Sequence, residues 1–163
     1  MPIRTFEDLL VDEIRDLYDA EHQLTKALPK MAKAASSPDL KNAFEAHLKQ
    51  TEGHITRLER VFEGLGKKPT RKTCAAMRGL VEEGSEVIDE EMDPEVKDAA
   101  LIGAAQRVEH YEMAGYGTVR TFAHLLGHHD LEAILQSTLE EEAAADEKLT
   151  GIASKINVKA MQH

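Results

Sequence analysis

The chain has 163 residues, which is long enough for one domain with a buried core. Its formal net charge of −10 argues against a protein that binds nucleic acid or an anionic membrane surface, because such proteins are more often basic. No apolar run approaches the roughly 20 residues of a membrane-spanning helix. The N-terminus lacks an apolar signal stretch, and the single cysteine, Cys74, excludes an internal disulfide, so we expect a cytoplasmic protein.

The first part of the chain is predicted to form two long helices. Residues 5–35 carry apolar side chains at spacings of three and four, and Thr5 with Asp8 resembles a capping box at the start of this helix. Pro29 lies inside it and is expected to kink it. The same spacing continues over residues 38–64, where glycines end the second helix. The short turn between the two helices predicts an antiparallel hairpin.

The second part of the chain is predicted to repeat this arrangement after a long crossover. The crossover contains a shorter helix over residues 73–92, and two long helices follow over residues 94–126 and 130–156. One long crossover between two hairpins is the ferritin-like connection, whereas a cytokine-like bundle would need two. We therefore predict an all-α, ferritin-like four-helix bundle with an additional crossover helix, as a single domain over residues 1–163.

Each long helix carries polar side chains near its midpoint, on the stripe that its apolar residues define. In antiparallel hairpins the midpoints lie at one level, so these groups are expected to converge in the centre of the bundle. Carboxylates at close range need either raised pKa values or a cation, and oxygen-rich ligation with an imidazole suits iron or manganese better than zinc. The residues are Glu21 in the first helix, His47, Gln50, Thr51 and His54 in the second, Glu109 and Glu112 in the third, and Glu142 and Asp146 in the fourth.

At these residues the sequence resembles the YciE/YciF family of bacterial stress proteins. The resemblance extends from Ile3 to Ala153 and implies a ferritin-like bundle similar to rubrerythrin, a homodimer, and a link to stress. The biochemical activity of the family is not established. The matching segments are Tyr18–Leu24, His47–His54, Cys74–Leu80, Val108–Glu112 with Tyr116–Thr118, and Thr138–Thr150.

The resemblance also implies which residues would hold a metal. The carboxylates that match the ferritin-like pattern, together with His54 as a nitrogen ligand, would hold two iron or manganese ions. An open position would take oxygen or peroxide. These carboxylates are Glu21, Glu109, Glu112, Glu142 and Asp146.

The second helix departs from the pattern, which has Glu-x-x-His there. Thr51 stands three residues before His54, and Glu52 lies about 200° around the helix from His54, so the two cannot face one site. Gln50 lies about 40° from His54 and is an alternative, neutral ligand. His47 is more readily explained as a hydrogen-bonded core histidine, although it is a further candidate ligand.

Two functions therefore stay open at this point, and the sequence does not decide whether the protein is an enzyme. The first is a stress-associated protein with a carboxylate-bridged di-metal site, related to redox or peroxide chemistry. The second is a non-enzymatic structural or interaction protein with a metal-free polar core. Storage of iron in a shell is a weaker third hypothesis, because no extra helix or pore motif for a cage is evident.

Overall fold

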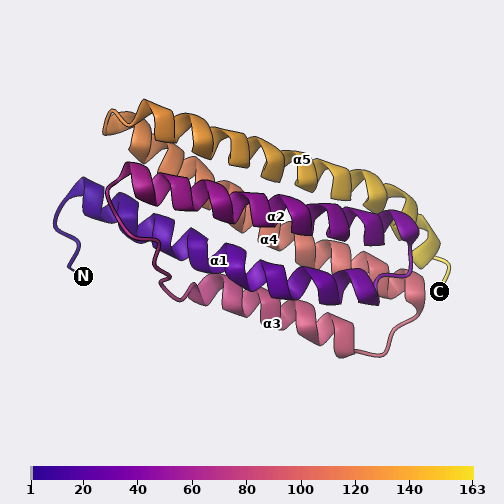
Figure 1. The fold of residues 1–163 in the computed structure, drawn as a ribbon. Coiled ribbons are helices and arrows are strands. Elements are labelled where there is room, and N and C mark those ends of the chain that lie inside the picture. The colour runs from indigo at the N-terminus through magenta and orange to yellow at the C-terminus, as the bar shows by residue number, and fades with distance from the viewer. Residues whose placement is uncertain (1) are drawn as a thin grey trace.

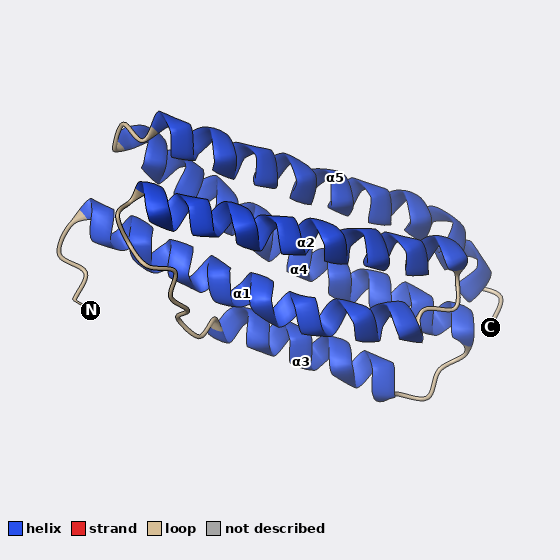
Figure 2. Cartoon of the chain, viewed as in Figure 1, coloured by secondary structure: helices blue, strands red, loops and turns tan. Residues whose placement is uncertain are grey.

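The computed structural model describes residues 2–163, and over this range it contains five α-helices and no strand (Figure 2). The all-α prediction is therefore confirmed. The last helix continues to Ala160 instead of ending near residue 156. None of these helices is both long and apolar enough to cross a membrane. The helices are α1 (Phe6–Ala34), α2 (Pro38–Gly64), α3 (Ala75–Asp89), α4 (Pro94–Leu125) and α5 (His129–Ala160).

The four long helices form two antiparallel hairpins (Figure 1). The first hairpin is α1 with α2, and the second is α4 with α5; α2 packs against α5, and α1 packs against α4. The shorter α3 lies outside this bundle, against α1 and α4. This is the predicted arrangement of two hairpins joined by one long crossover.

The start of α1 is fixed by the capping box that the sequence predicts. The Thr5 hydroxyl accepts a hydrogen bond from the Asp8 N–H at 3.0 Å, and the Asp8 carboxylate accepts one from the Thr5 N–H at 3.0 Å. Both bonds satisfy N–H groups that would otherwise lack partners at a helix start. Helix α1 then continues past Pro29 to Ala34.

The crossover is attached to α1 through a buried carboxylate. Asp19 accepts hydrogen bonds from the Cys74 N–H at 2.7 Å and from the Arg71 side chain at 2.8 Å. The Lys72 N–H donates to the Arg15 carbonyl at 3.2 Å. These contacts hold the start of α3 against α1.

The apolar core consists of two clusters, one towards each end of the bundle. On α1, Leu10, Ile14 and Leu17 belong to one cluster, whereas Leu24 and Leu28 belong to the other. The same division occurs on the other three long helices. The polar residues singled out from the sequence lie between the two clusters, so apolar packing on both sides positions them.

Asp98 joins the α1–α2 turn to α4, and its removal should destabilise the fold. It is buried, and its carboxylate accepts the N–H groups of Ser36 and Ser37, each at 2.8 Å. Since bonds to a charged acceptor are stronger than neutral ones, we expect Asp98→Ala to lower the free energy of unfolding by about 2 kcal/mol. Urea denaturation measures this, with the exposed Asp89→Ala as the matched control. Equal losses of unfolding free energy in Asp98→Ala and Asp89→Ala would contradict the role of Asp98 in joining the α1–α2 turn to α4.

Candidate metal centre

A layer of buried polar side chains crosses the middle of the bundle, and all four long helices contribute to it. Each of these side chains is at most 6% exposed. We call the set the central polar layer: Glu21 from α1, His47 and His54 from α2, Glu109 and Glu112 from α4, and Glu142 from α5.

One group of possible ligands in this layer is formed by Glu21, His54 and Glu142. The Nδ1 atom of His54 lies 3.0 Å from Glu142 Oε1 and 3.6 Å from Glu21 Oε1. Tyr116, which is fully buried, donates its hydroxyl hydrogen to Glu21 Oε1 at 2.8 Å. Helices α1, α2 and α5 thus each bring one donor atom to the same point.

A second group is formed by His47, Glu109 and Glu142. The Nε2 atom of His47 lies 2.9 Å from Glu109 Oε1 and 3.7 Å from Glu142 Oε2. The other ring nitrogen, Nδ1, lies 3.2 Å from the side-chain oxygen of Gln50. If Nδ1 carries the proton and donates to Gln50, the lone pair of Nε2 faces the centre of the bundle, as in a metal-ligating histidine.

Glu142 is shared by both groups. Its Oε1 atom faces His54, and its Oε2 atom faces His47. A carboxylate that offers one oxygen to each of two neighbouring positions has the geometry of a bridging ligand. Loss of Glu142 would therefore disrupt both groups of possible ligands.

Many polar atoms of the layer lack hydrogen-bond partners among the described residues. His47 Nε2 and His54 Nδ1 each come within 3.0 Å of a carboxylate oxygen, but neither contact has the geometry of a hydrogen bond. Buried polar groups are normally paired, so convergent unpaired ones suggest a missing cation. The buried atoms without a partner include Glu21 Oε2, His47 Nε2, His54 Nδ1, Glu109 Oε2, and both carboxylate oxygens of Glu112 and of Glu142.

The electrostatics of the layer follow from burying several acids together. Burial raises the pKa of Glu109 to about 7. Burial, together with the neighbouring carboxylates, raises the pKa of Glu112 and of Glu142 well above the ordinary value. Burial lowers the pKa of His54, but its contacts with Glu142 and Glu21 outweigh this and raise it to about 10. Without a metal, the layer therefore keeps protons that a divalent cation would displace.

The stability of the metal-free protein should fall as the pH rises above about 4.5. A carboxyl group with a raised pKa binds a proton in the folded chain and releases it in the unfolded chain, so its contribution is lost as the pH passes the folded pKa. For Glu109 this window runs from 4.5 to about 7, and for His54 it runs from 6.5 to about 10. Urea denaturation of chelator-treated protein across this range measures the slope. In Glu109→Gln the slope between pH 4.5 and 7 should be shallower, and an unchanged slope would contradict the assignment.

A second carboxylate, Glu141, orients His54 from outside the layer. Its Oε2 atom lies 2.7 Å from His54 Nε2, and Arg57 pairs with both of its oxygens, at 2.7 and 3.0 Å. An N–H bond from Nε2 to this carboxylate leaves Nδ1 free to act as a ligand. The sequence did not reveal this role, because Glu141 belongs to a run of acids that is equally typical of a solvated helix face.

Five of the six residues predicted as ligands come together in the layer, and Asp146 does not. The Asp146 Oδ1 atom accepts a hydrogen bond from Gln106 at 3.3 Å, and Oδ2 lies 3.2 Å from His110 Nε2. Asp146 is one helical turn beyond Glu142, which places it about 6 Å further along α5. On α2, the ferritin-like pattern has a glutamate where this chain has the buried Thr51. His47, one turn before Thr51, contributes a side chain to the layer instead.

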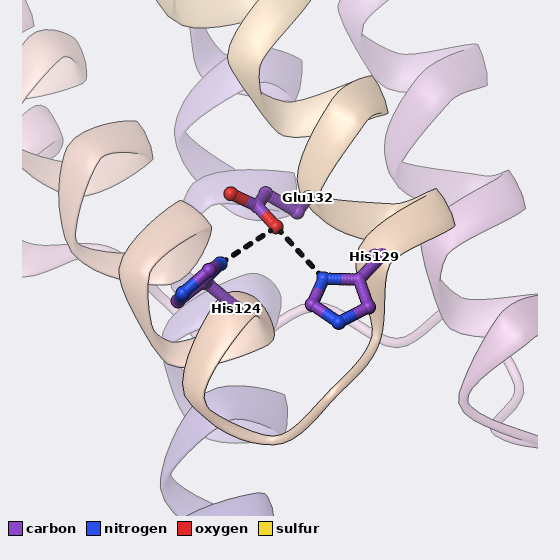
Figure 3. A group of neighbouring side chains, drawn as sticks. All are labelled: His124, His129 and Glu132. Carbon is purple, nitrogen blue, oxygen red and sulfur yellow. Dashed lines mark hydrogen bonds and ion pairs between the residues drawn. The ribbon is translucent and has the colours of Figure 1, made fainter.

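A different group of possible ligands lies on the surface, where α4 turns into α5 (Figure 3). Glu132 Oε2 lies 3.0 Å from His124 Nδ1 and 3.2 Å from His129 Nδ1, so one carboxylate accepts a bond from each ring. These bonds lower the pKa of Glu132. Both histidines are exposed, and the facing atoms satisfy one another, unlike those of the central polar layer.

Comparisons with known proteins agree with this fold. The family model described as "Domain of unknown function (DUF892)" matches residues 5–162. Protein YciF of Escherichia coli K12 is 49% identical over 162 residues, covering 98% of both chains. The crystal structure of this stress protein has a TM-score of 0.93 to the chain, with 48% identity, and covers 96% of this chain and 99% of YciF.

Two further solved structures are similar. YcfI from Rhodopseudomonas palustris, described as a putative structural protein, is 47% identical, has a TM-score of 0.89, and is matched over 91% of this chain and 94% of its own. A ferritin-like, diiron-carboxylate protein from Bacillus anthracis is 17% identical, with a TM-score of 0.71 over 93% of this chain and 99% of that one. At that identity the likeness supports the fold alone, and it confirms the ferritin-like prediction.

Proposed function

The chain belongs to the DUF892 family, and on that premise we propose that it is a stress-associated protein whose central polar layer holds two iron or manganese ions. One observation supports this proposal above the others. Two groups of buried donor atoms share Glu142, and many of their atoms lack partners among residues 2–163. Glu21, His54 and Glu142 would hold one ion, and His47, Glu109 and Glu142 the other. Glu112, whose two oxygens are buried and unpaired, would complete the oxygen-rich ligand set.

The surrounding residues would keep these ligands in place. Tyr116 holds Glu21, Glu141 holds His54, and Gln50 holds His47, so each of these ligands has a partner outside the metal positions. Such partners fix the orientation and tautomer of a ligand. The apolar clusters flank the layer on both sides, and each side chain of the layer is at most 6% exposed. When bound, a pair of iron or manganese ions would supply electron-transfer chemistry towards a small oxidant such as oxygen or peroxide.

A second function is favoured by the way in which the charges of the layer can balance without metal. His54 lies close to carboxylates on both sides of its ring, and Glu109, Glu112 and Glu142 hold protons more tightly than usual. The alternative is a metal-free structural or interaction protein that acts in the cytoplasm as a homodimer during stress. Such a protein would not exchange ligands at a metal and would not react with oxidants.

Elemental analysis of protein purified without added metal separates the two functions. The di-metal proposal predicts iron or manganese close to two ions per chain, followed by measurable consumption of peroxide. If the protein contains neither metal and takes up neither Fe²⁺ nor Mn²⁺ on titration, the metal-free alternative is correct.

A further inference from the structure

A cavity of about 140 Å³ lies inside the bundle, directly beside the central polar layer. Its apolar walls include Leu28, Met31 and Phe44, and its polar wall includes His47 and Glu109. All five of these side chains are buried. The cavity therefore extends from the candidate metal centre into the apolar cluster at one end of the bundle.

Small side chains create this space. Five alanines from α2, α4 and α5 line it, where larger residues would fill an ordinary packed core. Ala46 and Ala144 are exposed, so the cavity opens to solvent between α2 and α5, and the exposed Lys148 lies at the same opening. The five alanines are Ala43, Ala46, Ala105, Ala144 and Ala145.

The volume and lining limit what can bind. Protein interiors rarely contain a void larger than a water molecule, and an engineered apolar cavity of about 150 Å³ binds benzene. The present cavity is close to that size. It differs in having one polar wall, where His47 Nε2 and Glu109 Oε2 are buried without hydrogen-bond partners in the described part of the chain.

We propose that this cavity is the substrate pocket of the candidate metal centre, and that it accepts a small apolar organic molecule carrying one polar group. The apolar part would pack against Leu28, Met31 and Phe44. A hydroxyl or similar neutral polar group would face His47 and Glu109. The buried Glu109 carboxyl group in the polar wall disfavours an anionic group at that end.

The assignment as a substrate pocket depends on the proposed function, but binding of the probe does not require metal. Two probes are suitable, benzene and benzyl alcohol, and both can be titrated into chelator-treated protein and into the metal-loaded protein. Heteronuclear NMR locates the bound probe by the shifts of the Leu28 and Met31 methyl groups. Ala145→Leu fills the half-buried side of the opening, and Ala133→Leu adds the same side chain at an exposed position of α5 outside the cavity.

We expect both probes to shift the cavity methyl groups in the parent and in Ala133→Leu, and to bind at least about tenfold more weakly to Ala145→Leu. Thermal denaturation of the two variants checks that both remain folded. Metal loading should change the affinity for benzyl alcohol more than that for benzene, because only the alcohol has a group that reaches the polar wall. Equal affinities of the parent and Ala145→Leu, or shifts only outside the cavity, would overturn the pocket. Cavity binding without any uptake of metal would instead overturn the di-metal function.

Discussion

Replacement of Glu142 by alanine is expected to remove nearly all bound iron or manganese. Glu142 is the residue common to both groups of donor atoms, with one carboxylate oxygen facing His54 and the other facing His47. Under the di-metal proposal, its loss would leave each metal position one ligand short. We expect the metal content per chain to fall by at least about tenfold, because losing a ligand costs more than losing an outer partner, which itself costs 10–100-fold.

The control for this substitution is Glu140→Ala, which removes an exposed carboxylate from the same helix. Elemental analysis of parent and variants, purified in parallel, gives the comparison. The variant with Glu140 replaced should keep the parent's metal. If Glu142→Ala also keeps the parent's metal content, Glu142 is not a metal ligand. The approach of its two oxygens to His54 and His47 then has another cause.

Replacement of Glu112 by methionine should have opposite effects on the metal-free and metal-loaded protein. Glu112 is fully buried, and neither of its oxygens has a hydrogen-bond partner within residues 2–163. Burial and the nearby carboxylates raise its pKa, so its ionised form is strongly disfavoured. Replacing buried ionisable groups by well-packed apolar side chains of similar volume can stabilise a protein by about 1–4 kcal/mol. We expect a gain in this range for the metal-free protein, growing with pH.

In the metal-loaded protein, Glu112→Met would remove a proposed oxygen ligand, so the stabilisation that bound metal provides should decrease. Urea denaturation with and without chelator measures both effects. Glu52→Met, at an exposed mid-helix position of α2, should change the free energy of unfolding by no more than about 0.5 kcal/mol in either state. A loss of stability in the metal-free Glu112→Met protein would mean that the Glu112 carboxylate is already compensated.

The fold could be predicted from the sequence because its signals are local and regular. Residues such as Leu10, Ile14 and Leu17 recur at helical spacing, and Thr5 with Asp8 marks a helix start. The long segment between the hairpins then permits few arrangements. The convergence of Glu21 with Glu109 and Glu142 followed from the same pattern, since antiparallel hairpins place helix midpoints at one level.

The rest of the candidate site depends on side-chain contacts between helices, which spacing along one helix does not give. Asp146 shares the stripe of Glu142, but one turn along α5 is enough to pair it with Gln106 and His110 instead. The sequence favours a core histidine at His47, because an isolated histidine is more often hydrogen-bonded in a core than bound to metal, yet Glu109 approaches it from α4. Only the packing of α2 against α5 reveals that Glu141 reaches His54.

Anomalous diffraction from crystals of the protein loaded with Fe²⁺ or Mn²⁺ tests the di-metal proposal most directly. Data collected on both sides of the absorption edge of the metal locate it without reference to activity. We predict two anomalous peaks within the central polar layer, one between Glu21, His54 and Glu142 and the other between His47, Glu109 and Glu142. Crystals that show no peak in this layer at saturating metal, or peaks only at His124, His129 and Glu132, would contradict it.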